Sequence, residues 1–566
     1  MTRARKRPSG AAWTLGGILL FGLILRLWGI KTGLPLVYHL DEYAHFTISA
    51  VNMFGDGLNP NYFQNPPAYT YLLHTLFSIA YLTPPVGSLG ESIHHAFDTD
   101  PTDLFMIARV TTALMGIGAS WVLYFVGKRL FGVGVGLIAT AFLTFTFLPV
   151  HYGHFALNDI PMLLPLCIGL LGLAGISKRG KPIDYIVAGL GLGLATATKY
   201  TAAALAVAIF VAWAIRFYDD REQGKQEFLW LVGAAGVSLI AFVIANPFSV
   251  IDAKSFYYGV KRQSDLSSSV SKLGTDDVSG WVYYVKTLFW GYGIVPLGLS
   301  IAGAILMLRR DWRTALPLVI FTLLVWLFMG KQLRFYARWL LPIYPALALF
   351  SAYATLEAGK KIAALVKQTP TPRATTFATA GVVVVALAGS LIHVVHNDRV
   401  LSREDTRDIA KSWILQNIPP EDKIVFELIG PRPYYNVNGS RKGDPAFNIQ
   451  ELPRGTEVEK YASTLSPELI KQYEQDGYCW VVVGSIQKGR VTKDPEKMPE
   501  AAAYYEALDQ QAERVASFSP MKPGQSLPTF NFDISYNYYP LGYERPGPQV
   551  DIYRLNGANC ASDPQS

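Results

Sequence analysis

Four ionisable residues crowd into eight positions just past the first hydrophobic segment of the chain: His39, Asp41, Glu42 and His45. Unpaired charge beside a membrane is costly and usually has a functional reason. The rest of the chain is poor in charge, with only 16% Asp, Glu, Lys and Arg. A positioned carboxylate can take a proton from a hydroxyl, so this acidic patch is a candidate catalytic site.

A second polar patch lies between two later hydrophobic segments and contains His151, His154 and Asp159. Pro161 follows closely, at a place where the first turn of a helix tolerates proline. Asp159 could therefore be the N-cap of that helix. It could equally support a site together with the two histidines, and the two roles can coexist.

Cations form the third group, with Lys331, Arg334 and Arg338 just before another hydrophobic segment and Lys199 elsewhere. Arg334 and Arg338 are four residues apart and would share one face of a helix. Paired guanidinium groups suit a phosphate, which they bind through charge-assisted hydrogen bonds. The alternative is that the arginines reach toward lipid headgroups, as arginines often do at helix ends.

Together these groups suit the transfer of a group from a lipid-linked phosphate to a nucleophile. A carboxylate would deprotonate the acceptor, and cations would stabilise the charge that develops on the leaving phosphate. The sequence contains no GxxxxGK[ST] phosphate loop and no GxSxG motif, so nucleoside triphosphate hydrolysis and esterase chemistry are not indicated.

The elements that must position these residues are mostly hydrophobic. The chain of 566 residues is 51% hydrophobic and 13% aromatic, and its apolar residues come in blocks long enough to cross a bilayer. Eleven transmembrane helices are predicted, near 12–30, 105–126, 132–149, 160–176, 183–198, 200–216, 228–246, 285–308, 314–330, 337–356 and 377–396. The predicted fold class is mainly α, with a membrane domain at 1–400 and a small α/β domain at 401–566.

Loop charges predict the orientation of this membrane domain. With a cytoplasmic N-terminus, five predicted inner loops are all basic, which accounts for the net charge of +7 without nucleic acid. The first outer loop, 31–104, has one lysine against seven acidic residues. Asp41 and Glu42 are thus expected on the outer face, as is the 401–566 domain, and the first segment is expected to be a retained signal anchor.

The outer elements carry further expectations. Residues 43–54 and 68–81 are expected to be amphipathic helices. In the C-terminal domain, strands are predicted at 424–428 and 480–483 and helices at 404–417 and 500–514. A disulfide between Cys479 and Cys560 could persist there, and whether it forms is left open. The aromatic residues Tyr536, Tyr538, Tyr539 and Tyr543 could stack on sugars, although a role in the core is favoured.

Several of these motifs in combination resemble the GT-C glycosyltransferases. They are the Asp41-Glu42 pair in a large outer loop, Pro66-Pro67 followed by Tyr71-Leu72, the His/Asp loop at 151–161, the Ala-Thr-Lys-Tyr-Thr run at 197–201 and the Arg-Phe-x-x-Arg-x-Leu-x-Pro segment at 334–342. The branch most similar to the chain is the dolichyl-phosphate-mannose protein mannosyltransferase group with its bacterial aminoarabinose-transferase relatives. The resemblance covers residues 10–400.

The resemblance implies an inverting hexosyltransferase that uses a polyprenyl-phosphate sugar and a protein, lipid or glycan acceptor at the outer face. By position, Asp41 would be the general base and Glu42 would orient it or the acceptor. Lys331, Arg334 and Arg338 would contact the donor phosphate. No cofactor is certain, but Asp41, His45 and Asp159 could bind a divalent metal.

Other classes of protein remain open. A transporter or lipid-linked-sugar flippase would also have many spans and membrane-embedded charges, but the candidate charges lie in outer loops and no internal repeat is visible. A receptor or scaffold with a sensing domain at 401–566 would make the acidic patch incidental. Among enzymes, an oligosaccharide transferase or polymer ligase would use similar donors.

Overall fold

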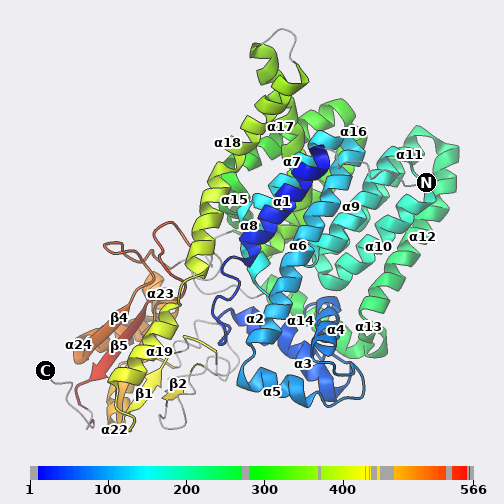
Figure 1. Ribbon diagram of the computed structural model, residues 1–566. Coiled ribbons are helices and arrows are strands. Elements are labelled where there is room, and N and C mark those ends of the chain that lie inside the picture. The colour runs from blue at the N-terminus through cyan, green and yellow to red at the C-terminus, as the bar shows by residue number, and fades with distance from the viewer. Residues whose placement is uncertain are drawn as a thin grey trace, which may run out of the picture. The chain divides into compact units, whose positions relative to one another are not determined.

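The protein folds into two compact units (Figure 1). The computed structural model describes residues 10–269, 279–366, 371–427, 429–431, 434, 443–445, 464–530, 538–557 and 560. The helical unit comprises residues up to Ile30, Ala44–Ser269 and Ser279–Asp398, and the C-terminal unit begins at Arg399. Residues Lys31–Tyr43 group with the C-terminal unit, although they belong to the predicted domain 1–400.

The helical unit consists of α-helices and short 3-10 or π segments. Its long helices are α1 (Gly10–Leu27), α6 (Thr102–Phe131), α7 (Val133–Phe145), α9 (Leu163–Lys178), α10 (Pro182–Thr198), α11 (Leu205–Asp219), α12 (Arg221–Ala245), α14 (Ala253–Ser269), α16 (Ile294–Gly330), α17 (Tyr344–Val366) and α18 (Pro372–Leu401). Shorter elements connect them: α3 (Phe46–Asp56), α4 (Ala68–Ala80), α5 (Glu91–Thr99), α8 (Phe147–His151), η1 (Tyr152–His154), η2 (Tyr200–Ala204), α13 (Phe248–Ile251), α15 (Gly280–Leu288), η3 (Phe289–Gly293) and η4 (Ala337–Ile343).

Each of the eleven predicted hydrophobic blocks overlaps a helix. Seven described helices are long and apolar enough to cross a membrane, or eight if the bent pair Val133–Phe145 and Phe147–His154 is one span. Two more apolar helices, α9 and α10, are shorter. The apolar range Gly280–Gly330 is interrupted by non-helical backbone at Asp311, between two of the predicted blocks. The number of spans stays a prediction.

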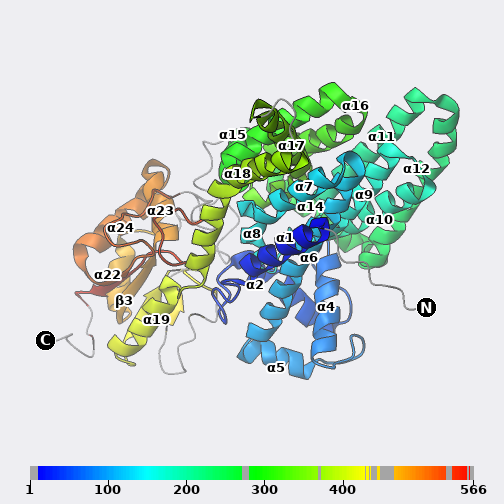
Figure 2. The same ribbon diagram turned by 45° about the horizontal axis from the view of Figure 1, so that its top comes forward.

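Small residues let neighbouring helices pack closely. Helices α9, α10 and α12 lie side by side in both views (Figures 1 and 2). A Cβ atom on Gly191 of α10 would come within 2.1 Å of the backbone of Gly169 in α9. Glycine at this crossing therefore permits the backbone approach that close helix packing in membranes requires.

The C-terminal unit is built on a five-stranded sheet with the order β2-β1-β3-β5-β4. Strand β1 (Lys423–Phe426) pairs in parallel with β2 (Gly443–Pro445) and β3 (Tyr478–Gly484). Strand β5 (Val550–Leu555) is antiparallel to β3 and to β4 (Ala512–Phe518). The helices of this unit are α19 (Thr406–Asn417), α22 (Glu468–Gln475), α23 (Ser485–Lys493) and α24 (Pro499–Gln511), with the short η5 (Pro495–Lys497).

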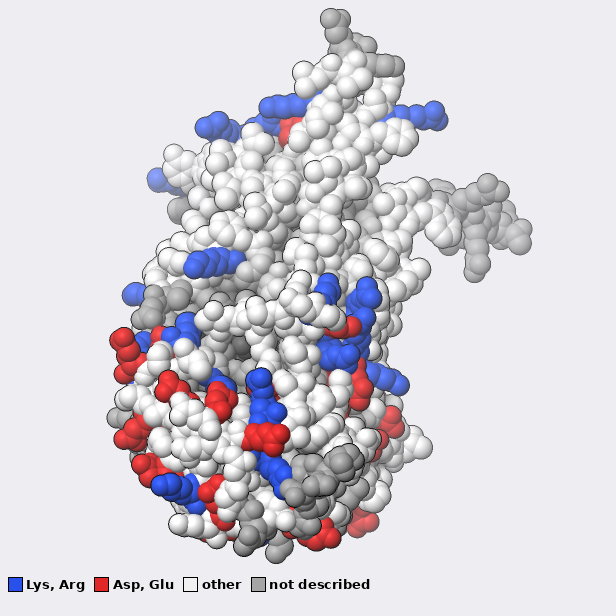
Figure 3. All heavy atoms as spheres, turned by 90° about the vertical axis from the view of Figure 1, so that its left-hand side faces the viewer, with Lys and Arg blue, Asp and Glu red and all other residues white. Residues whose placement is uncertain are grey.

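The central strands β1 and β3 contain runs of apolar residues, at 424–426 and 479–483. All residues of β3 after Tyr478 are buried, because one face of the sheet packs on a cluster that includes Leu465 and Tyr504 and the other on a cluster that includes Ile414 and Phe426. The predicted α/β character of this region is thus confirmed. Charged side chains of both signs are scattered among uncharged ones over the lower part of the face seen in Figure 3, as is usual for a surface in water.

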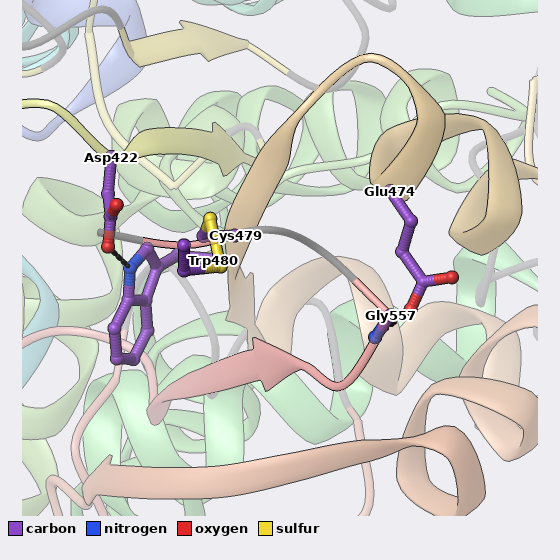
Figure 4. The surroundings of a disulfide bond; sticks show 6 residues. Asp422, Glu474, Cys479, Trp480 and Gly557 are labelled. Atoms are coloured by element: carbon purple, nitrogen blue, oxygen red, sulfur yellow. Dashed lines mark hydrogen bonds between the residues drawn. A yellow bond between two sulfur atoms is a disulfide. The ribbon is translucent and has the colours of Figure 1, made fainter. Parts of the chain in front are cut away.

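A disulfide joins Cys479 on β3 to Cys560 near the chain end (Figure 4). Beside it, the indole N–H of Trp480 donates to a carboxylate oxygen of Asp422 at 2.9 Å. The possibility left open by the sequence is therefore realised. Cys167 is a buried free thiol in α9.

Among the aromatic residues near the end of the chain, Tyr543 is buried, with 6% of its surface exposed. Tyr538 and Tyr539 are half-buried, and Tyr536 lies outside the described residues.

Candidate functional site

The acidic patch lies on a short helix, α2 (Leu40–Ala44). His39 precedes this helix and caps it, because its ring Nδ1 and its backbone carbonyl both accept the backbone N–H of Glu42, at 3.3 and 3.1 Å. Asp41 is half-buried and Glu42 is fully buried. One helical turn therefore fixes both carboxylates, and Asp41 keeps part of its surface accessible to a reactant.

His45 lies at the start of α3. Its ring stacks on Tyr62 with centroids 4.8 Å apart and an angle of 13° between the planes. A stacked ring has a preferred orientation, so His45 can support a site in the loop at 31–104.

Asp159 is buried between two cations in the helical unit. Its carboxylate lies 2.6 Å from the Nζ of Lys199 and 3.3 Å from the Nε of Arg338. The Arg338 guanidinium also stacks over Tyr336, 4.6 Å from the ring centroid. Asp159 therefore joins Lys199, which follows α10, and Arg338 of η4 in one buried ion-pair cluster.

The reading of Asp159 as a helix N-cap is wrong. Helix α9 begins at Leu163, its N-cap residue is Met162, and no side chain caps it. The local N-cap preference is overridden because Asp159 gains two charged partners distant in the sequence.

Arg334 and Arg338 do not share a helical face as expected. Tyr336 has extended backbone and the 3-10 helix η4 begins only at Ala337, so Arg334 lies before the helix. The backbone N–H groups of Leu333 and Arg334 both donate to the carbonyl of Ser267 in α14. The Nε of Arg334 is buried without a hydrogen-bond partner among the described residues.

Lys331 is exposed and lines an apolar cavity of about 600 Å³. The walls of this cavity come from η2, α15 and α16, and include Trp281, Leu324, Leu327 and Phe328. A cation at the edge of an apolar cavity matches the two halves of an amphipathic lipid.

His151 and His154 join a buried network with the end of α18. His151 Nδ1 is 3.0 Å from the side-chain oxygen of Asn397, and His154 Nε2 is 3.5 Å from a carboxylate oxygen of Asp398. Arg26 of α1 interacts electrostatically with Asp398 and donates to the carbonyl oxygens of Gly22 and Thr144. Both histidines therefore hold helices together in the interior of the helical unit.

No group of three or more His, Cys, Asp or Glu side chains within the described part of the chain is arranged to hold a metal ion. The possible ion site at Asp41, His45 and Asp159 thus has no structural support. Asp159 already has Lys199 and Arg338 as partners.

Three residues of this network were not among the candidate site residues predicted from the sequence: Arg26, Asn397 and Asp398. A signal was present, since Asn397 and Asp398 directly follow the last hydrophobic block and Arg26 lies inside the first. An ionisable residue inside an apolar segment is a functional or structural hypothesis by default.

Comparison with known proteins gives a family match and a fold. Residues 103–246 match the model of the family described as dolichyl-phosphate-mannose-protein mannosyltransferase. No curated protein sequence matches the chain.

The structure is similar to that of ArnT from Cupriavidus metallidurans bound to undecaprenyl phosphate, with a TM-score of 0.53, 14% identity and coverage of 98% of this chain and 100% of that one. It is also similar to the oligosaccharyltransferase of Archaeoglobus fulgidus. In the apo form of that protein the TM-score is 0.53 and the identity 12%, over 93% of this chain and 75% of that one. With an inhibitory peptide and a dolichol-phosphate bound, the TM-score is 0.51 and the identity 13%, over the same shares.

The expected resemblance is therefore confirmed: this chain has the fold of the GT-C membrane glycosyltransferases, and its residues 103–246 carry the sequence pattern of the dolichyl-phosphate-mannose-protein mannosyltransferase family.

Proposed function

We propose that the chain is an inverting glycosyltransferase that moves a sugar from a polyprenyl-phosphate donor to an acceptor hydroxyl at the outer face of the membrane. The acceptor oxygen attacks the anomeric carbon as the bond from that carbon to the phosphate oxygen breaks. The hydroxyl proton passes to a carboxylate, and the polyprenyl phosphate leaves with the bonding electron pair. A single displacement inverts the anomeric centre.

Asp41 is the proposed general base. It combines a negative side chain with partial exposure, and the preceding His39 caps the helical turn that carries it. Glu42 is buried in the same turn, so its proposed role is to orient the acceptor or Asp41. A base that is already held in place loses little conformational entropy when it reaches the geometry for proton transfer.

Arg334 and Lys331 are the proposed ligands of the donor phosphate. A buried guanidinium nitrogen without a partner among the described residues is costly unless a ligand supplies an acceptor. Phosphate oxygens are the acceptors that arginine binds best. Lys331 offers a second cation, and the apolar cavity that it lines suits the first isoprene units of the donor.

Arg338 and Lys199 have a different proposed part. Both are paired with Asp159, so they contribute positive potential near the site while Asp159 holds their side chains in place. Charge that is fixed before the reaction stabilises a developing negative charge effectively.

One observation carries this proposal: a GT-C fold, matched over nearly the whole chain by a protein that binds undecaprenyl phosphate, occurs together with a cation beside an apolar cavity. The fold alone would not distinguish an enzyme from a lipid transporter. The carboxylate pair on α2 favours the enzyme.

The test uses purified protein in liposomes with radiolabelled undecaprenyl-phosphate mannose, glucose or N-acetylglucosamine, and a Ser/Thr-rich peptide or a lipid as acceptor. Wild type should consume one donor and transfer its sugar. Asp41→Asn should lose at least 100-fold in rate while it still binds undecaprenyl phosphate. Asp98→Asn is the matched control, because Asp98 is an exposed acid in the same loop and its loss should change nothing.

An Asp41→Asn variant as active as wild type would refute the assignment of the base. If the wild-type protein moves a fluorescent lipid-linked sugar across the bilayer without consuming it, the protein is a transporter and the proposal is wrong.

A further inference from the structure

The segment that carries the proposed base is packed into the C-terminal unit. Residues Lys31–Tyr43 group with that unit, and Leu36 and Tyr38 pack against its core cluster, which includes Phe426, Tyr434 and Trp480. The residues directly before α2, and most of α2 itself, therefore belong to the C-terminal unit.

Tyr38 is held by three residues of this unit. Its hydroxyl donates to a carboxylate oxygen of Asp408 at 2.5 Å. The guanidinium of Arg407 lies over its ring, 3.6 Å from the centroid, and the ring of Tyr434 meets it edge-on at 6.2 Å. We call Tyr38, Arg407 and Asp408 the Tyr38 clamp.

Arg407 of the clamp is itself held by several hydrogen bonds. Arg407 makes two hydrogen bonds to the carboxylate of Asp405, both at 2.8 Å, and a third to the carbonyl of Ile429. Asp405 in turn caps α19 by accepting the N–H of Arg407. A guanidinium with this many partners loses little further conformational freedom when Tyr38 packs against it.

The phenol of Tyr38 remains a donor at any ordinary pH. Burial raises its pKa, and the neighbouring carboxylates of Asp405 and Asp408 raise it further, against the opposing effect of Arg407. The Tyr38 hydroxyl therefore keeps its proton and can donate to Asp408, in a hydrogen bond that is charge-assisted when that carboxyl is ionised.

The backbone next to the clamp is strained. Val37 has φ of +55°, a conformation that a β-branched residue rarely adopts. Its side chain is buried, with 1% exposed. Such strain persists only where the surroundings determine the conformation, and it is concentrated at functional sites. Here it lies four residues before Asp41 and directly beside the clamped Tyr38.

From these contacts we infer that the Tyr38 clamp positions the turn that carries Asp41 and Glu42, so that Tyr38, Arg407 and Asp408 are positioning residues for sugar transfer. This inference rests on the proposed function, because it assigns the C-terminal unit a part in that reaction. None of the three residues touches the reacting atoms. They act through the backbone between Tyr38 and Asp41, where only His39 and Leu40 intervene.

The first arm of the test is structural and needs no substrate. Hydrogen–deuterium exchange of the backbone in 37–43 is compared among wild type, Tyr38→Phe, Asp408→Asn and two controls. Tyr218→Phe and Asp476→Asn are matched controls because both residues are exposed. Exchange should be at least tenfold faster in the two clamp variants and unchanged in the controls. Unchanged exchange in the clamp variants would overturn the inference.

The second arm is kinetic. Tyr38→Phe keeps the ring over Arg407 and loses one charge-assisted hydrogen bond, so kcat should fall about tenfold. Tyr38→Ala also loses the ring, and a misplaced base should lower kcat about 100-fold. The KM for the donor should not change in either variant, since the clamp does not touch the donor. A general structural defect would instead alter KM and the unfolding temperature together.

A double-mutant cycle tests the link itself. The effects of Tyr38→Phe and Asp408→Asn on kcat should not add, because either change removes the same hydrogen bond. Full additivity, or an unaltered kcat in both variants of an active enzyme, would overturn the inference. If wild type transfers no sugar at all, the proposed function fails, and the exchange arm still decides whether the clamp holds the segment.

Discussion

Asp159 shows how one buried carboxylate brings together two cations that lie far apart in the sequence. Its side chain is 2% exposed and pairs with both Lys199 and Arg338. Breaking a buried ion pair by removing one partner is far more costly than forming it is favourable, since an uncompensated charge stays behind. Removal of the Asp159 carboxylate would take a charged partner from both Lys199 and Arg338.

Asp159→Asn should therefore lower the free energy of unfolding of the helical unit by about 3 kcal/mol. Urea or thermal unfolding in detergent would measure it. Asp219→Asn is the control, since the pair of Asp219 with Arg313 is exposed and should contribute nothing measurable. If the two substitutions lowered the free energy of unfolding by equal amounts, water would reach the ion pairs of Asp159 as it reaches the exposed pair.

Arg334 differs from Asp159, whose carboxylate is paired: the buried Nε of Arg334 has no hydrogen-bond partner among the described residues. Arg334→Gln should raise the Kd for undecaprenyl phosphate about tenfold, the value of a charge-assisted hydrogen bond, without lowering stability. Binding of fluorescent undecaprenyl phosphate would measure it. Lys254→Gln, at an exposed cation of α14, should leave the Kd unaltered; a similar loss there would indicate nonspecific attraction.

Glu427 makes the stability of the C-terminal unit depend on pH. Burial raises its pKa to about 8, although the N–H of Gly484 and the hydroxyl of Tyr505 favour the charged form. Below about pH 4.3 both folded and unfolded chains hold the proton and the contribution to stability is complete. Between that pH and about 8 only the folded unit holds it, so stability falls by about 1.4 kcal/mol per pH unit from this group.

Glu427→Gln keeps an uncharged side chain of similar shape, so this part of the slope should disappear. Unfolding of the C-terminal unit, followed at pH 5, 6, 7 and 8, would show the two curves diverging as pH rises. Parallel curves would mean that the carboxyl is ionised in the folded unit.

At the level of elements, α1, η1 and α18 meet through polar side chains in an apolar interior. Arg26, His154 and Asp398 are all buried, and each comes from a different element of the helical unit. Asp398 lies near the end of α18, where the helical unit ends along the chain. The network thus links the end of α18 to α1 inside the helical unit.

Asp398→Ala should destabilise the helical unit by about 3 kcal/mol, because it removes the buried contact with His154 and the electrostatic interaction with Arg26 together. The double variant Arg26→Met with Asp398→Leu should recover most of that loss. Thermal unfolding of the three proteins would measure this. No recovery in the double variant would mean that packing, rather than charge, is what Asp398 supplies.

Hydrophobic periodicity was enough to predict most elements. The amphipathic stretches at 43–54 and 68–81 are helices α3 and α4, and the strands and helices expected in the C-terminal domain are present. Their signals are local. The residues that a side chain contacts in the folded protein cannot be predicted from its neighbours in the sequence. For Asp159 the preference of aspartate for helix N-caps suggested a cap, but Lys199 and Arg338, which pair with it, lie 40 and 179 positions further along the chain.

For the whole molecule, the segment Lys31–Tyr43 is the part that no sequence rule could assign. Tyr38 and Asp408 are 370 residues apart, and neither lies in a recognisable motif. Their contact arises because Leu36 and Tyr38 cover apolar residues of the C-terminal unit. The catalytic assignment of Asp41 came from the sequence and stays a prediction, while its link to that unit needed the structure.

The disulfide Cys479–Cys560 closes a loop with a sequence separation of 81 residues. By loop-closure entropy it should stabilise the C-terminal unit by about 4.5 kcal/mol. Cys479→Ser with Cys560→Ser should lower the unfolding free energy by an amount of this order, and reductant should affect wild type only. A reductant effect of equal size on the double variant would rule out the disulfide as the cause.

The central claim is a single displacement at the anomeric carbon of a polyprenyl-phosphate sugar, with Asp41 as the base. The most direct test is the anomeric configuration of the product, read by NMR after transfer from a donor of known configuration. Inversion in the wild-type product, with no product from Asp41→Asn, is the predicted result. Retention of configuration would contradict the mechanism, because it requires two displacements and a covalent intermediate.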